Sequence, residues 1–309
     1  MFLENLKTIG VQVVILYAIA AVGFVADKRR IYTQDVAKKT TDLLFNIVLP
    51  MAVISTFMKM ERTPERIKGL FIALACAVVT HLLGIVLGAL TFRKKDVMER
   101  GIYRYAIVFS NAAFLALPLA QTVVGDEGVF YCSVYVGVFN AFAFTFGVHV
   151  ISGKKAKINA KSVLFNPGTV SIVIGVILFL LQIKLPGIIA KPMEMIGSLN
   201  SPLAMLVFGT FLANANLKKL FLKKEFYLVS LLRLVVIPLI MLLVYKFVGL
   251  AGNIAVSLVI SASAPTATNT AMYAGRYEND SALASQLAAQ STVLSVVSMP
   301  VIVALAGMM

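Results

Sequence analysis

Acidic residues and cysteines are both scarce in this chain. Asp and Glu together number 14 in 309 residues, against 28 Lys and Arg, and all of them lie in connectors or at the edges of apolar runs. This distribution argues against a proton relay built from buried carboxylates. The two cysteines, Cys76 and Cys132, lie within apolar segments, where we expect small buried side chains rather than a disulfide or a metal site.

Hydrophobic residues are correspondingly abundant, at 60 % of the chain with a mean hydropathy of +0.91. A membrane-spanning helix needs about 20 predominantly apolar residues, and the chain divides into ten such runs separated by short connectors. We therefore predict an all-α polytopic membrane protein. The predicted spans cover residues 9–25, 43–58, 69–92, 102–124, 129–151, 166–181, 196–213, 226–248, 253–274 and 283–306.

The net charge of +14 is a property of the connectors. Nineteen of the 28 Lys and Arg lie in connectors that follow odd-numbered spans or, for Arg104, at the adjoining edge of the next span. Basic residues accumulate in cytoplasmic loops of membrane proteins, so we expect these connectors inside, both termini outside, and a multi-pass protein of the cell membrane. The same reasoning excludes nucleic acid as the partner of the excess charge.

Five spans in each half would give the halves opposite orientations in the membrane. A weak internal similarity supports this, because residues 50–57 resemble residues 202–211 when a two-residue gap is allowed. Inverted repeats of this kind are typical of secondary transporters. The predicted units are a first repeat at 1–153, a basic cytoplasmic connector at 154–165, and a second repeat at 166–309.

Two spans carry polar residues and a proline in their interior. The first is Ser110-Asn111 followed by Pro118, and the second runs from Ser261 to Thr270 around Pro265. Proline removes a helical hydrogen bond and clashes with the preceding turn, and such a break persists in lipid only where protein or an aqueous cavity covers it. Paired interrupted spans in corresponding halves point to a transporter's binding site.

Where two unwound helices cross, the half-helix N-termini offer free N–H groups and a partial positive charge that attract anions. Neutral polar side chains could complete such a site, or could instead satisfy freed backbone groups and join helices. We expect no cofactor and no metal. The candidate substrate-binding residues are Ser110, Asn111, Pro118, Asn140, Ser263, Pro265, Thr266, Asn269 and Gln290, with Asn46, Asn200, Arg233 and His81 as possible supporting residues.

Two of the supporting residues are ionisable and lie inside predicted spans. Arg233 could be a counter-charge for an anionic substrate or a structural partner for helix-end carbonyls, and we favour the structural alternative. His81 could titrate, although a single histidine on an apolar face is more often a hydrogen-bonded core residue. A coupling Na⁺ or H⁺ and uniport driven by the membrane potential all remain open.

Several of these motifs, in this order, resemble the auxin efflux carrier family of membrane transport proteins in its short prokaryotic form. The resemblance covers essentially the whole chain. It rests on Asn46 with Pro50, Ser110-Asn111 with Phe114 and Pro118-Leu119, Asn166-Pro167, Arg233 with Pro238, and Ala264-Pro265 followed by Tyr277, Asp280 and Ser285.

The resemblance implies a scaffold of spans one, two, six and seven and a moving transport domain of the other six, with spans four and nine crossing. It also implies a homodimer held through the scaffold and elevator-like movement. Members carry small organic anions, auxin in plants and dicarboxylates such as malate or malonate in bacteria. This chain lacks the long central loop of plant carriers, so phosphorylation control through that loop is not expected. It has one proline at the second break, where plant members tend to have two, which argues against auxin itself. The candidate substrates are auxin-like or malate- or malonate-like mono- and dicarboxylates.

Three alternatives belong to other functional classes or mechanisms. A sodium-coupled carrier similar to bile-acid symporters would share the broken helices but require Na⁺. An anion channel would show large, non-saturating flux. An intramembrane enzyme would need paired buried carboxylates, a metal-binding H-E-x-x-H motif or a nucleophilic serine beside a histidine, and the sequence contains none of these. We therefore expect a non-enzymatic carrier of a small organic anion.

Overall fold

The computed structural model describes residues 2–153, 155–156, 164–214 and 220–309, except for the side chains of residues 2–5. These residues form helices and connecting loops without any strand, so the predicted all-α fold is confirmed. Most of the predicted connector at 154–165, together with Lys218 and Lys219, lies outside the described residues.

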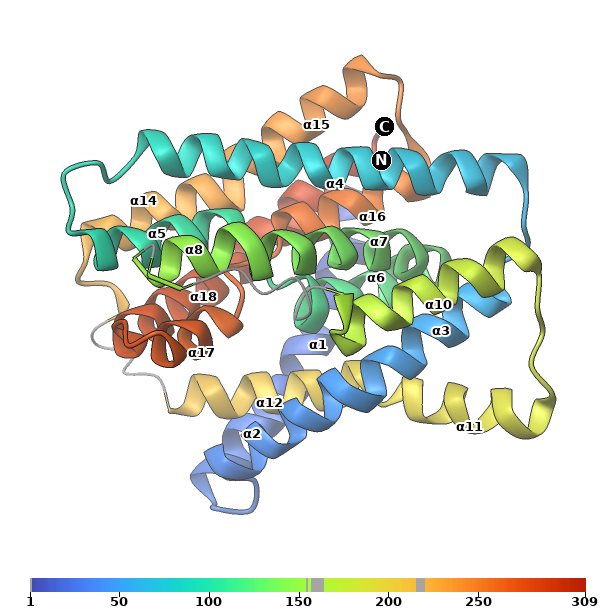
Figure 1. Cartoon of the computed structure of the whole chain (residues 1–309), viewed down its shortest axis with the longest axis horizontal. Helices are drawn as coiled ribbons and strands as arrows, with labels where there is room; N and C mark the ends of the chain where they lie inside the picture. The colour runs from blue at the N-terminus through green and yellow to red at the C-terminus, as the bar shows by residue number, and fades with distance from the viewer. Residues whose placement is uncertain (1, 154, 157–163, 215–219) are drawn as a thin grey trace.

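Figure 1 shows the arrangement of the described helices, and η denotes a π-helical segment, in which each turn holds about one extra residue. Those of the first half are α1 (Phe2–Lys28), α2 (Gln34–Leu43), η1 (Leu44–Val48), α3 (Leu49–Lys59), α4 (Pro64–Leu90), α5 (Val97–Val108), η2 (Ala112–Ala116), α6 (Leu117–Val123), α7 (Asp126–Phe142), η3 (Ala143–Gly147) and α8 (Val148–Ile151). Those of the second half are α10 (Pro167–Leu181), α11 (Gly187–Ser198), α12 (Asn200–Ala213), α14 (Lys224–Leu231), η4 (Leu232–Val236), α15 (Ile237–Phe247), α16 (Gly252–Ser263), α17 (Asn269–Arg276) and α18 (Ser281–Ala306).

Seven helices among the described residues are long and apolar enough to cross a membrane. Three more apolar helices are shorter, namely Ala112–Val123, Pro167–Leu181 and Gly252–Ser263. Large apolar side chains face outward on the long helices, for example Val14 on α1 (65 % exposed) and Phe71 on α4 (68 % exposed). Such surfaces suit contact with lipid. These helices are consistent with a multi-pass membrane protein, while ten spans in inverted repeats remain a prediction.

Three π-helical segments each end shortly before a proline. Pro50 follows η1, Pro118 follows η2 and Pro238 follows η4, and each proline is at the start of the next α-helix. Proline has no N–H and its ring clashes with the carbonyl of the preceding turn. A widened turn removes that conflict while keeping the helix continuous. At each of these three prolines the chain therefore remains helical.

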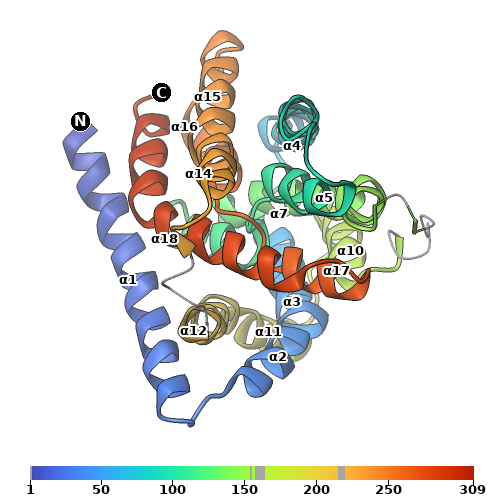
Figure 2. The same cartoon turned by 90° about the vertical axis from the view of Figure 1, so that its left-hand side faces the viewer.

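The tightest helix pair joins the two halves of the chain. α1 packs along α12, and a Cβ built on Gly209 would lie 1.8 Å from the carbonyl oxygen of Ala20. A Cβ on Gly23 would lie 2.3 Å from the carbonyl oxygen of Leu206. Only glycine permits so close an approach of two backbones. Figure 2 shows α1 running along one side of the molecule with α12 beside its lower half.

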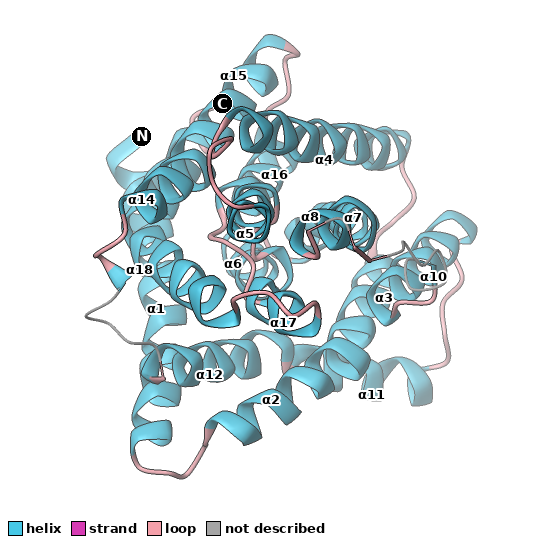
Figure 3. Ribbon diagram, turned by 60° about the vertical axis from the view of Figure 1, so that its left-hand side comes forward, coloured by secondary structure: helices cyan, strands magenta, loops and turns pink. Residues whose placement is uncertain are grey.

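The helices pack as two sets. In one set α1 lies against α12, and α3 lies against α10 and α11; in the other α7 lies against α4, α6 and α16, and α16 also lies against α15 and α18. Figure 3 shows α2, α11 and α12 along the lower side of the molecule, with α5, α7 and α16 above them. The sets meet mainly where α1 contacts α18 and where α7 contacts α3 and α10.

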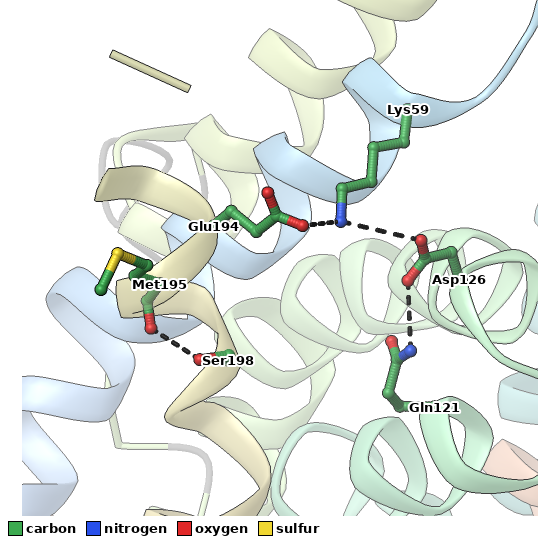
Figure 4. A network of polar contacts seen from close by, with 6 residues as sticks. All are labelled: Lys59, Gln121, Asp126, Glu194, Met195 and Ser198. Atoms are coloured by element: carbon green, nitrogen blue, oxygen red, sulfur yellow. Dashed lines mark hydrogen bonds and ion pairs between the residues drawn. The ribbon is translucent and has the colours of Figure 1, made fainter. Parts of the chain in front are cut away.

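One ionic contact connects the two sets near the end of α3 (Figure 4). The Lys59 ammonium forms ion pairs with Glu194 on α11 and, at 3.9 Å, with Asp126 at the start of α7. Gln121 on α6 donates a hydrogen bond of 3.1 Å to the same Asp126 carboxylate. All the charged partners are partly exposed, and exposed ion pairs contribute little to stability. The contact therefore marks where the two sets adjoin and contributes little to the free energy of folding.

Candidate functional site

Two helices are interrupted where the sequence predicts breaks. α5 ends at Val108 and η2 begins at Ala112, which leaves Phe109–Asn111 outside regular helix. α16 ends at Ser263 and α17 begins at Asn269, with Pro265 in the unwound segment. The first break ends at Asn111, seven residues before Pro118, so the interruption lies at Ser110-Asn111 and not at the proline itself. Pro118 instead lies at the start of α6, where the preceding π turn accommodates it.

The two unwound segments lie directly against each other. The backbone N–H of Asn111 donates to the carbonyl of Pro265 at 2.6 Å, and the N–H of Ala267 donates to the carbonyl of Phe109 at 2.9 Å. Ser110 and Thr266 form an isolated antiparallel bridge between these bonds. Each segment thus satisfies backbone groups that the other has freed, which is necessary away from water. We call this junction the crossing.

Side chains of the second segment complete the hydrogen bonding of the crossing. The Thr266 hydroxyl donates to the Ala106 carbonyl at 3.2 Å, while the Thr266 N–H donates to the Ser291 hydroxyl on α18 at 3.1 Å. The Ser263 hydroxyl donates to the Ile260 carbonyl one turn earlier. The buried Ser110 hydroxyl has no partner among the described residues. Thr266 and Ser263 therefore hold the backbone, and Ser110 is the hydroxyl that remains available.

Two asparagines flank the crossing at the starts of helical segments. Asn111 precedes η2, is 4 % exposed, and its amide makes no side-chain hydrogen bond within the described chain. Asn269 is the first residue of α17, and its Oδ1 accepts a hydrogen bond of 3.3 Å from the Tyr105 hydroxyl. The first N–H groups of a helix have no intrahelical partners. Amide groups and helix N-termini thus gather at one place, as an anion site requires.

Arg233 lies behind the crossing and is fully buried. Its guanidinium donates to the carbonyls of Ile107 and Val108 at 3.1 Å each, and to the carbonyl of Ala262. These carbonyls are at the C-terminal ends of α5 and α16, where a positive charge is favourable. These contacts match the structural role considered for Arg233, a partner of helix-end carbonyls. Both Nη1 and Nη2 of its guanidinium donate to the protein.

Three further predicted residues, Gln290, Asn140 and His81, lie on α18, α7 and α4. Gln290 on α18 is buried and accepts a hydrogen bond of 3.1 Å from Ser230, while its Nε2 has no partner in the described chain. Asn140 on α7 approaches Gly168 at the start of α10, between the two helix sets. His81 on α4 is buried among aromatic rings, stacked on Phe142, and its Nδ1 lies 2.7 Å from the Ala77 carbonyl.

Within the described residues, neither Asn46 nor Asn200 forms a side-chain hydrogen bond to the crossing. Asn46 lies in η1, is exposed, and donates to the Asp42 carbonyl at 2.7 Å. Asn200 is the first residue of α12 and is buried. Sequence reasoning missed Tyr105, whose hydroxyl contacts Asn269 and whose ring packs on Tyr273. The only available signal was a tyrosine inside an apolar run four residues before Phe109.

Comparison with known proteins agrees with this architecture. A family model described as "Membrane transport protein" matches residues 8–303. A protein of Methanothermobacter thermautotrophicus (strain Delta H) described as "Uncharacterized transporter" is 24 % identical over 288 residues, which cover 90 % of this chain and 92 % of that protein. The match over nearly the whole chain establishes the resemblance noted from the motifs. This chain belongs to the membrane transport protein family, the family of the auxin efflux carriers, and is a membrane transporter.

Proposed function

We propose that this transporter is a secondary carrier of a small organic anion, an auxin-like or malate- or malonate-like mono- or dicarboxylate, which binds at the crossing. The observation that carries the proposal is the hydrogen-bonded pair of interrupted helices, Asn111 N–H to Pro265 and Ala267 N–H to Phe109. Such a junction places two helix N-termini together inside the membrane protein, where they favour an anionic group.

The polar groups at the crossing favour a carboxylate over a cation. The Asn111 amide is not engaged by the described residues, and the Nδ2 of Asn269 has no acceptor among them, so both side chains offer N–H donors. The charge of Arg233 is directed at helix-end carbonyls. The negative charge of the guest would therefore be met by amide donors and helix dipoles rather than by an ion pair. Neutral coordination of this kind permits release as well as binding.

The two helix sets suggest how the site changes sides. We assign α1, α2, α3, α10, α11 and α12 to a scaffold and the remaining helices to a transport domain that contains the crossing. The glycine contacts between α1 and α12 make one scaffold seam too tight to slide. Elevator movement of the transport domain along this scaffold would expose the crossing alternately on each side.

Several companion expectations belong to the same proposal. The two sets would combine inverted repeats at 1–153 and 166–309, joined by the connector at 154–165. The scaffold would also hold a homodimer in the cell membrane, with both termini outside. A coupling Na⁺ or H⁺ is compatible with the site.

The test is uptake of labelled mono- and dicarboxylates into proteoliposomes, with counterflow measured in the presence and absence of Na⁺. We expect saturable counterflow that Asn111→Ala and Asn269→Ala each reduce at least about tenfold, the loss of one good hydrogen bond to a charged group. Asn253→Ala is the matched control, because Asn253 is exposed and pairs with Glu127 away from the crossing.

The result that would overturn the site is full transport by both crossing variants. Strict dependence of counterflow on Na⁺ would favour the alternative of a sodium-coupled carrier similar to bile-acid symporters. Non-saturating flux without counterflow would favour an anion channel. These measurements distinguish the proposed carrier, a sodium-coupled carrier and an anion channel by the Na⁺ dependence and the saturation of the flux.

A further inference from the structure

Three arginines converge on the C-terminal end of α4. Arg93 Nε and Arg104 Nη2 both donate to the carbonyl of Ala89, each at 3.3 Å, and Arg104 Nε donates to Gly88 at 3.0 Å. Arg100 Nη1 donates to the carbonyl of Arg93 at 3.2 Å. Two guanidinium groups thus meet at one oxygen, and the third contacts the same turn. We call Arg93, Arg100 and Arg104 the arginine cluster.

The carboxylates nearest in the chain are already engaged elsewhere. Glu99 accepts a hydrogen bond from Tyr103 and pairs with Lys95, and Glu225 pairs with Lys95 at 2.6 Å. The hydrogen bond that the Lys95 ammonium donates to Glu225 raises the pKa of Lys95. Asp96 caps the N-terminus of α5 through the Met98 N–H. Within the described chain the arginine cluster therefore has no carboxylate partner.

The hydrogen bonds to backbone carbonyls use only some of the N–H donors of each guanidinium. A guanidinium has five N–H donors, and the described residues accept one from Arg93, one from Arg100 and two from Arg104. Arg93 is exposed, and Arg100 and Arg104 are partly exposed. Like charges in one cluster repel one another, so a shared anion would stabilise the three guanidinium groups. Arginine forks match phosphate oxygens in pairs.

An apolar strip begins beside the cluster. Leu82, Val86 and Leu90 are 47 %, 54 % and 57 % exposed and follow one another at four-residue spacing on α4. Residues four apart lie on one helix face. The surface thus combines a group of unengaged guanidinium N–H donors with an exposed apolar strip that leads away from it along α4.

We propose that the arginine cluster binds the phosphate headgroup of an anionic phospholipid whose acyl chain lies along the Leu82–Leu90 face of α4. The apolar strip is the reason to assign a lipid rather than a free phosphate. Basic groups at the end of spanning helices are suited to anionic headgroups. The bound lipid would brace the connection between α4 and α5, the helix that leads into the crossing.

The experiment is native mass spectrometry of the purified full-length protein titrated with phosphatidylglycerol and, separately, phosphatidylcholine. We expect preferential retention of phosphatidylglycerol and about a hundredfold weaker retention in Arg93→Gln/Arg100→Gln/Arg104→Gln, from three basic groups at an anionic surface. The control Arg29→Gln/Lys38→Gln/Lys39→Gln removes the same charge from exposed positions elsewhere and should retain the lipid.

Further arms keep the result interpretable. Arg93→Gln alone changes an exposed side chain, so it should fold normally and weaken retention about fivefold. Millimolar inorganic phosphate should not displace the lipid. The proposal fails if the triple variant or Arg93→Gln binds phosphatidylglycerol like the wild type, if the control loses as much, or if inorganic phosphate competes fully.

Discussion

The backbone N–H of Asn111 and the carbonyl oxygen of Pro265 are joined by a hydrogen bond of 2.6 Å between opposite halves of the chain. The bond runs from the residue that begins one helical segment to the proline that interrupts another helix. Because both partners lie in unwound backbone, neither break is stable in lipid without the other. The candidate site and the joining of the two halves are therefore one structural feature.

Ser291→Ala tests how strongly the crossing depends on its α18 support. The change removes the acceptor of the buried Thr266 N–H. An unsatisfied buried donor costs about 1–3 kcal/mol, so thermal unfolding in detergent should begin at a lower temperature. Ser198→Ala is the control, because the Ser198 hydroxyl only contacts a carbonyl of its own helix. Equal melting temperatures for the two variants would show that the Thr266 N–H finds another partner.

Arg233→Lys and Arg233→Met test the capping of the two half-helices. The guanidinium reaches carbonyls on both α5 and α16, and a lysine ammonium lacks the planar fork needed to reach both. We expect Arg233→Met to cost about 3 kcal/mol in stability, since hydrogen bonds to charged groups are worth about 1.5–3 kcal/mol each. Arg233→Lys should lie between Arg233→Met and the wild type.

Stability and anion affinity distinguish the two roles considered for Arg233. If Arg233→Lys and Arg233→Met fold as well as the wild type but lose substrate affinity, the residue is a counter-charge for the substrate. The measurements are denaturant unfolding in detergent and the concentration dependence of uptake.

Gly209→Ala tests the seam between α1 and α12. A methyl group there would lie 1.8 Å from the Ala20 carbonyl oxygen, so the helices must separate. Overpacking of this kind costs typically about 1–3 kcal/mol, which thermal unfolding would detect. Gly10→Ala is the matched control on α1, since no atom lies within 4 Å of the added methyl. There the change should be neutral or stabilising by about 0.5–1 kcal/mol.

Chemical cross-linking tests whether the two helix sets move relative to each other. Cysteines at Lys59 and Asp126 would bridge the sets, whereas cysteines at Lys59 and Glu194 would bridge α3 and α11 within one set. In a background with Cys76→Ala and Cys132→Ser, a short bifunctional reagent should stop transport in the first pair and spare the second. Undiminished transport in the bridged Lys59–Asp126 protein would rule out elevator movement between these sets.

The two breaks illustrate what the sequence could predict. Pro265 lies inside the second unwound segment, so local chemistry predicted that break correctly. At the first break the proline does not mark the unwound residues. The π turn of η2 accommodates Pro118, and the chain unwinds earlier, at Phe109–Asn111. A π-helical turn has no signature in amino-acid composition or in the spacing of apolar residues. The all-helical fold and the family were predictable because hydrophobic run length and motif order are properties of the chain itself.

The partners at the site were less predictable. Arg233 was recognised as a costly buried charge, but its acceptors at Val108 and Ala262 come from two other helices. The contact between Tyr105 and Asn269 likewise depends on how α5 and α17 approach each other. These are consequences of three-dimensional packing, which a single sequence does not encode in any local pattern.

The π turns before Pro50, Pro118 and Pro238 also affect helix register. Each residue of an α-helix turns the chain by about 100°, so one additional residue reorients everything beyond it by roughly that angle. Deleting a single residue from Ala112–Ala116 would rotate the side chains of α6 by about 100° about the helix axis. The length of these short segments, more than their composition, thus decides which side of each helix meets its neighbours.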